Sequence, residues 1–240
     1  SVTYGIDTTA DVMPTKMNLS VNGIELDLRT SRGPLHIRSS LLGRGNTYNI
    51  LAAAAAGAAM DLPFSAIEHG ILSVPRVPGR MQLVSGREDA VTVVVDFAHT
   101  EDALRGALET ARGLTDGRLI TVFGCGGERD ATKRPLMGAV AGRLSDLVIV
   151  TSDNPRSEDP DQIVRDIGLG RGDSTQWLTV LDRTEAINQA IQKARPGDLV
   201  VIAGKGHEQH QVIGTKKVPF DDSNVARDAL TLRRSGSRVG

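Results

Sequence analysis

Four short polar clusters carry the residue types with which this chain of 240 residues could bind a small charged ligand. They are DFAHT at 96–100, GCGGER at 124–129, DNPR at 153–156 and GKGHE at 204–208. Each cluster follows an apolar, largely β-branched run, which is typical of a strand. Ligands of open parallel sheets bind beyond the carboxyl ends of the strands. The sequence therefore predicts a ligand site at that edge of a sheet.

Two arginines are the strongest indication of what this site would bind. Arg129 and Arg156 are expected to project from adjacent strand ends. A guanidinium is a planar fork that matches a carboxylate or a phosphate, so two of them beside a crevice predict a doubly anionic or amino-acid ligand. The alternative is that each arginine pairs with a local carboxylate, Asp130 or Glu158, on a solvated surface. The residues alone leave both interpretations open.

The remaining clusters suggest contacts of other kinds. In GKGHE, glycines flank Lys205 and Glu208 ends the loop, so backbone carbonyls and one carboxylate are available to hold an ammonium group. His207 alone is more often a structural residue than a catalytic base. Asp96 either accepts a hydrogen bond from a ribose hydroxyl or caps the following helix. No Ser/His/Asp or Cys/His arrangement has the context of a nucleophilic site, so no catalytic residue is assigned.

The glycines at 124–127 do not complete a dinucleotide-binding fingerprint. The pattern G-x-G-x-x-G requires a glycine where Arg129 stands, which weighs against an α/β oxidoreductase. The phosphate-loop motif G-x-x-x-x-G-K-[ST] is also missing from the sequence. We expect the glycines to let backbone N–H groups approach an anion, helped by a helix starting near Thr132. Cys125 is the only cysteine, which excludes an intrachain disulfide, and it is expected to fill space in the loop.

The composition is that of an ordinary soluble globular protein. Hydrophobic residues make up 40% of the chain and the net charge is −1, which gives no support to a nucleic-acid partner. The sequence has no apolar run of about 18 residues and no signal-peptide pattern at its N-terminus. We therefore expect a cytoplasmic protein with no nucleic-acid partner and no membrane contact.

Alternating strands and helices are predicted to position the clusters. Apolar runs predict strands at 91–98, 119–124, 147–152, 178–181 and 199–204, and helices are predicted at 102–112, 132–144, 160–167, 185–194 and 224–232. Continuous apolar strands that alternate with helices indicate an α/β fold with a doubly wound, mostly parallel sheet covered on both faces. Residues 78–240 are predicted to form one complete domain.

Residues 1–77 have a different pattern. Alternating apolar residues around Asn22-Gly23 predict a hairpin, and a third strand at 34–39 completes a small meander. Residues 50–60, rich in alanine and leucine, predict a helix buried on several sides because it has little polar surface. A second helix is predicted at 64–72, and prolines after it place a domain boundary near residue 77.

Taken together and in this order, these motifs resemble the Mur ligase family. The matching stretches are LLGRGNTYNILAA, VPGRM, DFAHT, FGCGGERDATKRPLMG, DNPR and GKGHE. The resemblance implies a three-domain enzyme with a UDP-binding domain, a central ATP-binding domain and a C-terminal Rossmann-like domain that brings the incoming amino acid. Residues 1–77 would then be the C-terminal part of the central domain and 78–240 the whole C-terminal domain. Such a fragment, without its N-terminal and remaining central domains, is expected to be inactive alone.

The resemblance also implies a reaction of peptidoglycan precursor synthesis. ATP would phosphorylate the D-glutamyl carboxylate of UDP-N-acetylmuramoyl-L-alanyl-D-glutamate, and the amine of meso-diaminopimelate would attack the acyl phosphate to form an amide. Mg²⁺ would neutralise phosphate charge, with ligands mostly in the missing region, and no metal ligand is assigned in this chain. The alternative is a stand-alone module that binds an amino acid or nucleotide without catalysis.

Matching motif by motif, the resemblance implies roles for ten residues. Those at the nucleotide would be Asn46 and Asn49 by the adenine, Asp96 by the ribose and Arg80 by the phosphates. Those lining the diaminopimelate site would be Arg129, Asp153, Asn154, Arg156, Gly204 and Glu208. His99 belongs to a matching motif without an assigned role. Glu128 stands where the family more often has aspartate, and little consequence is expected.

Arg156 is expected to select between two similar substrates. Diaminopimelate differs from lysine by one distal carboxylate, which the guanidinium fork would receive. With lysine bound, the guanidinium would lie partly desolvated and unpaired, a penalty that can separate substrates by orders of magnitude. A preference for diaminopimelate over lysine follows as a hypothesis.

Overall fold

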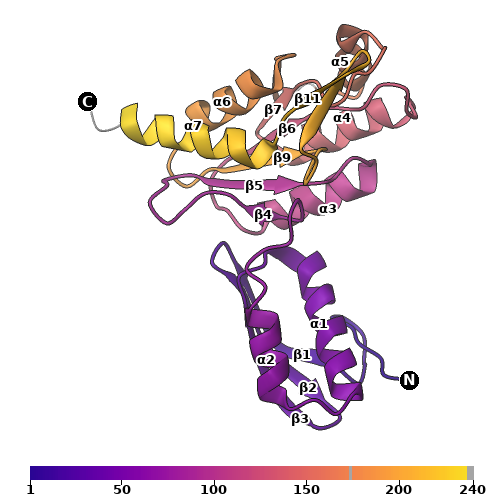
Figure 1. Cartoon of the computed structure of the whole chain (residues 1–240), viewed down its shortest axis with the longest axis vertical. Coiled ribbons are helices and arrows are strands. Elements are labelled where there is room, and N and C mark those ends of the chain that lie inside the picture. The colour runs from indigo at the N-terminus through magenta and orange to yellow at the C-terminus, as the bar shows by residue number, and fades with distance from the viewer. Residues whose placement is uncertain (173–174, 237–240) are drawn as a thin grey trace. The chain divides into compact units, whose positions relative to one another are not determined.

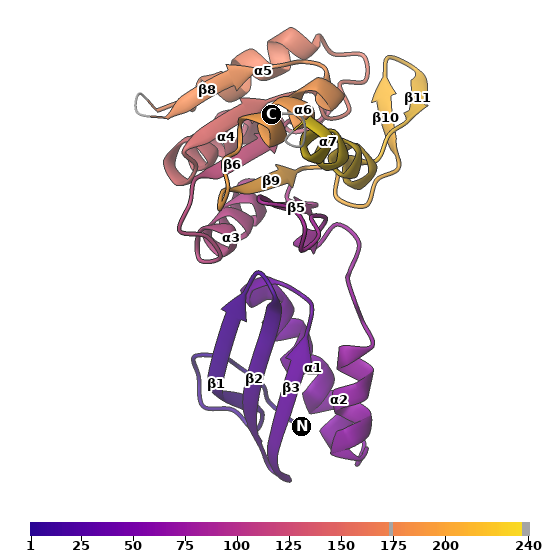
Figure 2. The ribbon, with the colours of Figure 1, turned by 90° about the vertical axis from the view of Figure 1, so that its left-hand side faces the viewer.

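The computed structural model describes residues 1–172 and 175–236. The chain forms two compact units, Ser1–Val77 and Pro78–Gly240 (Figures 1 and 2). Each unit has its own sheet and its own buried core.

Three antiparallel strands and two helices form the first unit (Figure 1). Its elements are β1 (Met13–Ser20), β2 (Gly23–Thr30), β3 (Gly33–Ser39), α1 (Gly43–Ala59) and α2 (Phe64–Leu72). The strands lie in the order β1-β2-β3, and the turn before β2 is Val21-Asn22, one residue earlier than the predicted Asn22-Gly23, because Gly23 already pairs with Ser20. Alternate residues point into the core, so that Leu26 of β2 pairs with Ile37 of β3 and both are buried. The predicted meander and helices are confirmed.

Helix α1 buries one face only. It begins at Gly43 rather than near residue 50, and Leu51 and Ala54 are among its fully buried residues. Tyr48, Ala53 and Ala56, one or two turns apart on another face, are exposed. Within this unit the predicted burial on several sides is therefore not seen, and burial against the missing part of the central domain stays a prediction. Inside the unit, its buried face packs with the strands and the other face has no neighbouring element that covers it.

The second unit is built on a six-stranded sheet in the order β4-β5-β9-β6-β7-β8. The strands are β4 (Gln82–Leu83), β5 (Thr92–Asp96), β6 (Leu119–Phe123), β7 (Leu147–Val150), β8 (Gln176–Thr179) and β9 (Leu199–Ala203). All neighbours run parallel except β4, which pairs antiparallel with β5. The predicted doubly wound, mostly parallel α/β sheet is confirmed. Sequence analysis missed only the short edge strand β4 of this sheet.

Helices cover both faces of this sheet (Figure 2). They are α3 (Glu101–Arg112), α4 (Lys133–Leu144), α5 (Pro160–Gly168), α6 (Arg183–Lys193) and α7 (Asp222–Gly236). Helices α6 and α7 pack together over one face, where Ile187 and Ile191 meet alternate strand residues such as Val95 and Ile202. Helix α4 packs with α3 and α5 on the other. Because both faces are covered, the central strands are apolar throughout.

A small hairpin between β9 and α7 was not predicted. Its strands are β10 (His210–Ile213) and β11 (Lys216–Pro219), joined by a turn in which Gly214 has a φ of +58°. Every residue of β11 is exposed, so the strand lacks the apolar alternation by which strands are recognised in a sequence. The hairpin lies beside the carboxyl edge of the main sheet and contacts one of the polar clusters there.

Candidate functional site

The sheet order brings the four polar clusters to one edge. Asp96 ends β5, Gly204 follows β9, Gly124 follows β6, and residues 153–156 come shortly after β7. These four strands are consecutive neighbours and all parallel, so their carboxyl ends lie along the same edge. The predicted arrangement of the clusters is confirmed, whereas the role of each residue in ligand binding stays a prediction.

The loops after β6 and β7 are joined by hydrogen bonds. The Gly127 N–H donates to the Asn154 carbonyl at 2.9 Å, and Arg156 Nη1 donates to the Gly127 carbonyl at 2.6 Å. A Cβ atom on Gly127 would lie 2.0 Å from the Pro155 carbonyl oxygen, which is why a glycine is required here. At Gly127 the prediction of an N–H group facing an anion is wrong, because that group is used between the loops.

Two non-glycine residues in these loops have left-handed backbone conformations. The φ angles are +53° at Glu128 and +54° at Arg156, and this region costs an L-residue roughly 1–2 kcal/mol. Glu128, in the loop after β6, is held by residues that follow the DNPR loop after β7. Its N–H donates to the Glu158 carboxylate, and its own carboxylate accepts hydrogen bonds from Ser157. The paired loops thus supply the contacts that offset this backbone strain.

Neither candidate arginine forms an ion pair within the described residues. Glu158 forms an ion pair with Arg134 at 2.7 Å. Asp130 accepts hydrogen bonds from the N–H and the hydroxyl of Thr132. The alternative in which Asp130 and Glu158 neutralise Arg129 and Arg156 is therefore wrong. Among the residues that the structure describes, the Arg156 side chain donates only from Nη1, to the carbonyls of Gly127 and Asn154. Its Nε and Nη2 edge is available to receive a carboxylate.

A fully buried lysine connects the loops after β7 and β9. Lys205 Nζ donates to Asn154 Oδ1 at 3.0 Å and to Glu208 Oε2 at 2.9 Å. Asn154 Nδ2 donates to the same Glu208 oxygen at 2.9 Å, and the Val212 N–H donates to Asn154 Oδ1 at 2.9 Å. In the structure Glu208 Oε2 binds the ammonium of the protein's own Lys205, and the predicted contact of this loop with an ammonium group of a ligand stays a prediction.

Asp153 lies beside this network and is 8% exposed. Burial raises the pKa of Asp153 above its ordinary value, although the charges of Arg183 and Lys205 act in the opposite direction. Gly204 has a φ of +115°, and a Cβ atom there would lie 2.9 Å from Asp153 Oδ2. Glycine is thus required at 204 both for its backbone conformation and for the approach of the carboxylate.

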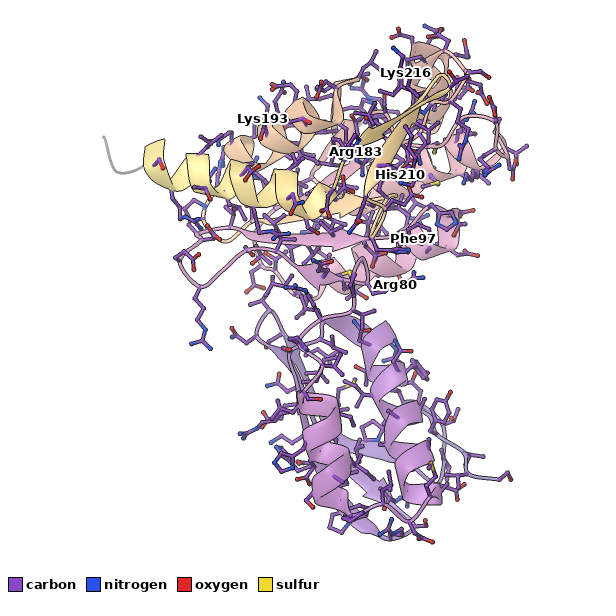
Figure 3. The ribbon with its side chains drawn as sticks, viewed as in Figure 1. Arg80, Phe97, Arg183, Lys193, His210 and Lys216 are labelled. Carbon is purple, nitrogen blue, oxygen red and sulfur yellow. The ribbon has the colours of Figure 1, made fainter. Side chains whose placement is uncertain are left out.

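Arg183 is a completely buried residue that sequence analysis missed (Figure 3). Its guanidinium forms two bonds to the Asp222 carboxylate, at 2.7 and 2.8 Å, and donates to the carbonyls of Ala203 at 3.0 Å and Ser152 at 3.4 Å. It therefore connects α6 and α7 to the ends of β7 and β9. Nothing local in the sequence distinguishes it from an exposed arginine in the first turn of a helix.

Strand β10 holds the DNPR loop in place. Gln211 Nε2 donates to the Asp153 carbonyl at 2.7 Å, the Arg156 N–H donates to the Val212 carbonyl at 3.1 Å, and the Gly214 N–H donates to the Arg156 carbonyl at 2.7 Å. Both backbone groups of Arg156 are thus bound to the hairpin. The missed hairpin therefore sets where the Arg156 side chain begins.

Asp96 is buried at the end of β5 and accepts two backbone hydrogen bonds. These come from the N–H groups of Met81 at 2.8 Å and Ala98 at 2.9 Å. Burial raises the pKa of Asp96, and the two N–H groups oppose this shift. The N-cap of α3 is Thr100, whose hydroxyl accepts from Ala103. The alternative in which Asp96 caps this helix is therefore wrong.

Aromatic and cationic side chains lie at the part of the carboxyl edge next to the end of β5. The Arg80 guanidinium lies 5.4 Å from the centre of the Phe97 ring (Figure 3). The ring also packs against His99 and His207, at centroid distances of 4.6 and 5.1 Å. His207 thus has the structural contacts expected of a lone histidine. Among the described residues Arg80 forms no ion pair, so its charge is available to an anion.

The other two predicted nucleotide residues belong to the first unit. Asn46 is buried in α1 and donates to the Leu42 carbonyl at 2.8 Å. Asn49 is exposed one turn on, and its Nδ2 donates to Asn46 Oδ1 at 3.3 Å. The second unit therefore contains eight of the ten predicted site residues, and the other two belong to the first unit.

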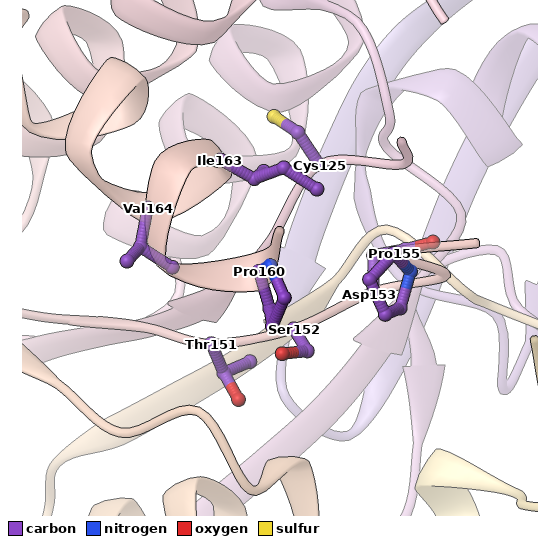
Figure 4. Close-up of a pocket in the computed structure, with 8 residues that line it drawn as sticks. All are labelled: Cys125, Thr151, Ser152, Asp153, Pro155, Pro160, Ile163 and Val164. Carbon is purple, nitrogen blue, oxygen red and sulfur yellow. The ribbon is translucent and has the colours of Figure 1, made fainter. Parts of the chain in front are cut away.

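A hollow beside the DNPR loop is too small to be the ligand site (Figure 4). It is lined by Cys125, Thr151, Ser152, Asp153, Pro155, Pro160, Ile163 and Val164, and leaves no space for a water molecule. Burial raises the pKa of Cys125 to about 12, so the thiol is unreactive at neutral pH. Cys125 fills space in the loop, as predicted.

Residues 1–172 and 175–236 contain no group of three or more His, Cys, Asp or Glu side chains that could hold a metal ion. In the same part of the chain, every helix is too short or too polar to span a bilayer.

Comparison with known proteins identifies the family. The family model described as "Mur ligase, glutamate ligase domain" matches residues 79–206, and the "Mur ligase middle domain" model matches residues 1–57. The chain belongs to the Mur ligase family. The first Mur ligase match includes DFAHT, GCGGER and DNPR and reaches into GKGHE, so it covers the carboxyl edge. Membership in a ligase family removes the oxidoreductase interpretation.

Curated Mur ligases are similar along nearly the whole chain. The UDP-N-acetylmuramoyl-L-alanyl-D-glutamate--2,6-diaminopimelate ligase of Synechococcus elongatus is 47% identical over 234 residues, which is 98% of this chain and 47% of that protein. The ligase of the same name from Thermosynechococcus vestitus is 49% identical over 232 residues, which is 96% of this chain and 47% of that protein. The chain thus spans about half the length of these curated Mur ligases.

Solved structures agree with the Mur ligase assignment. A structure of a ligase of the same name matches 97% of this chain and 48% of its own, with a TM-score of 0.73 and 39% identity. Mycobacterium tuberculosis folylpolyglutamate synthase, complexed with ADP and AMPPCP, matches 83% of this chain and 46% of its own, with a TM-score of 0.64. Its 23% identity shows a common fold only. The predicted resemblance to Mur ligases is confirmed.

Proposed function

We propose that this chain is the amino-acid-binding part of an ATP-dependent ligase that joins meso-diaminopimelate to UDP-N-acetylmuramoyl-L-alanyl-D-glutamate. Two relatives whose names contain both of these substrates are 47% and 49% identical to this chain. The observation that carries the proposal is the carboxyl edge itself. There, Arg129 and Arg156 have no described ion-pair partner, and they lie on the same edge as the carboxylates of Asp153 and Glu208.

This edge offers complementary charges to an amino acid with two carboxylates. Asp153 and Glu208 would receive an ammonium group, and the guanidinium groups of Arg129 and Arg156 would receive carboxylates. Burial alone would raise the pKa of Glu208, but the hydrogen bonds from Asn154 and Lys205 outweigh it and hold that pKa below its ordinary value. Glu208 is therefore ionised at neutral pH and suited to bind a cation.

Arg156 would supply the selectivity against lysine. Its Nη1 is already bonded to backbone carbonyls, so the Nε and Nη2 edge is the part that would meet the distal carboxylate. Lysine lacks that carboxylate and would leave this edge desolvated without a partner. The hairpin contacts to the Arg156 backbone keep the fork at one position, which favours discrimination.

The residues at the nucleotide end fit ATP in part. Each Asp96 oxygen accepts one N–H group and keeps a further acceptor position for a ribose hydroxyl. Arg80, stacked on Phe97, would contact the phosphates, and Asn46 and Asn49 the adenine. When bound, ATP would supply the phosphoryl group that activates the glutamyl carboxylate. Mg²⁺ would accompany the ATP, and we assign its ligands mostly to the part of the full-length protein that this chain does not contain.

The chemistry assigned to this chain is binding and orientation. The site would hold meso-diaminopimelate so that one amine faces the activated glutamyl carbonyl, and holding two reactants in place supplies much of the rate in such reactions. The new C–N bond replaces the carboxyl-to-phosphate bond, and the amine loses a proton. The UDP-linked peptide and the rest of the nucleotide would be held by the N-terminal and central domains, and we place the enzyme in the cytoplasm.

An assay of the full-length protein containing this chain tests the proposal. Incubated with ATP, Mg²⁺, the UDP-linked dipeptide and meso-diaminopimelate, it should release phosphate and form the extended peptide, detected by mass spectrometry. Omitting any one reactant should abolish the product. Binding of meso-diaminopimelate without any product would instead support a non-catalytic binding module and contradict the ligase proposal.

A further inference from the structure

The buried lysine of the GKGHE loop contacts two residues of the proposed site and is itself out of reach of solvent. Lys205 is 0% exposed, and its ammonium bonds to Asn154 and Glu208 at 3.0 and 2.9 Å. A buried ammonium is costly unless it is paired and hydrogen-bonded, so a group of this kind has to be held by its partners. The same contacts fix those partners in turn.

Hydrogen-bond chemistry determines how the Asn154 amide is oriented. Lys205 Nζ and the Val212 N–H can only donate, and both lie at Oδ1, at 3.0 and 2.9 Å. That atom must therefore be the carbonyl oxygen, and the Nδ2 group must face Glu208, at 2.9 Å. Removing the ammonium would take away one of the two donors that prevent the amide from turning over.

Glu208 is held by one oxygen and presents the other. Its Oε2 accepts from both Lys205 and Asn154, whereas Oε1 has no partner among the described residues. The side chain is 29% exposed, so Oε1 is within reach of a ligand. The carboxylate is therefore both fixed in direction and open on one side, which suits it to receive a cation.

The charges around Asp153 leave room for one more cation. Three carboxylates, those of Asp153, Glu208 and Asp222, interact there with two cations, Arg183 and Lys205. When all three carboxylates are ionised, these five groups leave one negative charge unbalanced; His210, which also acts on Glu208, has a charge only when it is protonated. An ammonium from a ligand would neutralise it, and a buried group of charges is most favourable when it is fully paired.

We propose that Lys205 is a positioning residue for amino-acid recognition: its buried ammonium locks Asn154 and Glu208 in one orientation, so that Glu208 Oε1 receives a primary ammonium of the ligand. This inference rests on the proposed function, since it names the group that prepares the same site. Lys205 itself does not touch the ligand, because both of its described contacts are to the protein.

Lys205→Met tests this role, because it removes the charge and keeps much of the side-chain volume. In calorimetric titrations of this chain with meso-diaminopimelate at pH 7, the affinity is expected to fall about tenfold or more. Binding requires the ionised carboxylates of Glu208 and Asp153 and is lost as the pH falls through their pKa values. Lys205 lowers both pKa values, so both rise without it and the acid-side loss of binding should move to higher pH; His210, which also acts on Glu208, is the same in both chains.

Lys193→Met is the matched control. Lys193 is exposed near the end of α6 (Figure 3). The Lys193→Met chain should therefore bind the ligand with the affinity and pH dependence of the unsubstituted chain. Merely structural damage in the Lys205→Met chain would weaken binding by the same factor at every pH. Equal affinity, or weaker binding whose acid limb stays in place, would overturn the role of Lys205 alone. Absence of binding by the unsubstituted chain would contradict the proposed function and the inference with it.

A measurement on the unsubstituted chain covers the case in which Lys205→Met does not fold. The ammonium of Lys205 is buried and hydrogen-bonded, so its protons should exchange slowly with water and give a lysine ¹⁵N resonance that shifts when meso-diaminopimelate binds. A slowly exchanging lysine resonance that responds to the ligand supports the proposal. If no such resonance exists, or if it does not change on binding, the proposal is wrong.

Discussion

Asp153 is subject to two opposing requirements, burial in the protein and a negative charge for ligand binding. It is nearly buried, which raises its pKa and favours the neutral form, yet it has to be charged to attract an ammonium. Arg183 and Lys205 partly offset that burial. Residues placed against their own preference in this way are typical of functional sites, where stability is lost for the sake of binding.

We expect Asp153→Asn to change stability in a pH-dependent way. Because the folded pKa of Asp153 lies above that of the unfolded chain, its contribution is favourable below about pH 4 and is lost as the pH rises through the folded value. Asparagine does not ionise, so the stability of the variant does not include this loss. The melting temperature of the variant, relative to the original chain, should therefore increase from about pH 4 to about pH 8, while binding of meso-diaminopimelate weakens.

The test is how the difference in melting temperature between the variant and the original chain changes with pH. Thermal melts of both chains at several pH values give the difference directly, and other titrating groups cancel because both chains contain them. A difference that does not depend on pH, or that decreases as the pH rises, would contradict a raised pKa at Asp153.

At the scale of elements, the loops after β6 and β7 act as one structure. The carbonyl and N–H groups of Gly127 are bonded to Arg156 and Asn154, and the two left-handed residues lie in these two loops. The close approach depends on glycines. A side chain at 124 or 127 would collide with a backbone carbonyl oxygen of the neighbouring loop.

We expect Gly127→Ala to destabilise the chain by about 1–3 kcal/mol, because its Cβ would lie 2.0 Å from a backbone oxygen that cannot easily move. Gly106→Ala is the matched control, since Gly106 is an exposed position inside α3 with open space around it. That change should stabilise the chain by about 0.5–1 kcal/mol. Urea denaturation measures both, and equal stabilities of the two variants would contradict the packing role of Gly127.

The central elements could be predicted from sequence because each was marked by its own residues. Strands β5, β6, β7 and β9 are continuous β-branched runs between glycines and charged residues, so their carboxyl ends, and hence the four clusters, were located in advance. The hairpin was not, since its second strand is exposed and each strand has four residues. The exposed face of α1 is not marked in the sequence, because alanine occurs equally well in buried and exposed positions of a helix.

At the scale of the whole molecule, the amino-acid end and the nucleotide end differ in how they are built. All six residues predicted for the amino acid belong to the second unit, and two of the four predicted for the nucleotide belong to the first. The second unit can therefore be tested for amino-acid binding without the nucleotide.

What the sequence did not reveal at this scale is the set of buried charges. Arg183 meets Asp222 across 39 positions, and Lys205 meets Asn154 across 51. Such pairs depend on the sheet order β5-β9-β6-β7, in which β9 lies between two strands that precede it in the chain. No local pattern encodes that insertion, so the polar residues could be listed from the sequence but their partners could not.

The most direct test of the account is a calorimetric titration of this chain with meso-diaminopimelate and with L-lysine, repeated with Arg156→Ala. The central claim is that the carboxyl edge is an amino-acid site in which Arg156 reads the distal carboxylate. It predicts binding of meso-diaminopimelate, binding of lysine that is weaker by on the order of 100-fold or more, and loss of most of that difference in the variant. Equal affinities for the two amino acids, or a ratio that Arg156→Ala leaves unchanged, would contradict it.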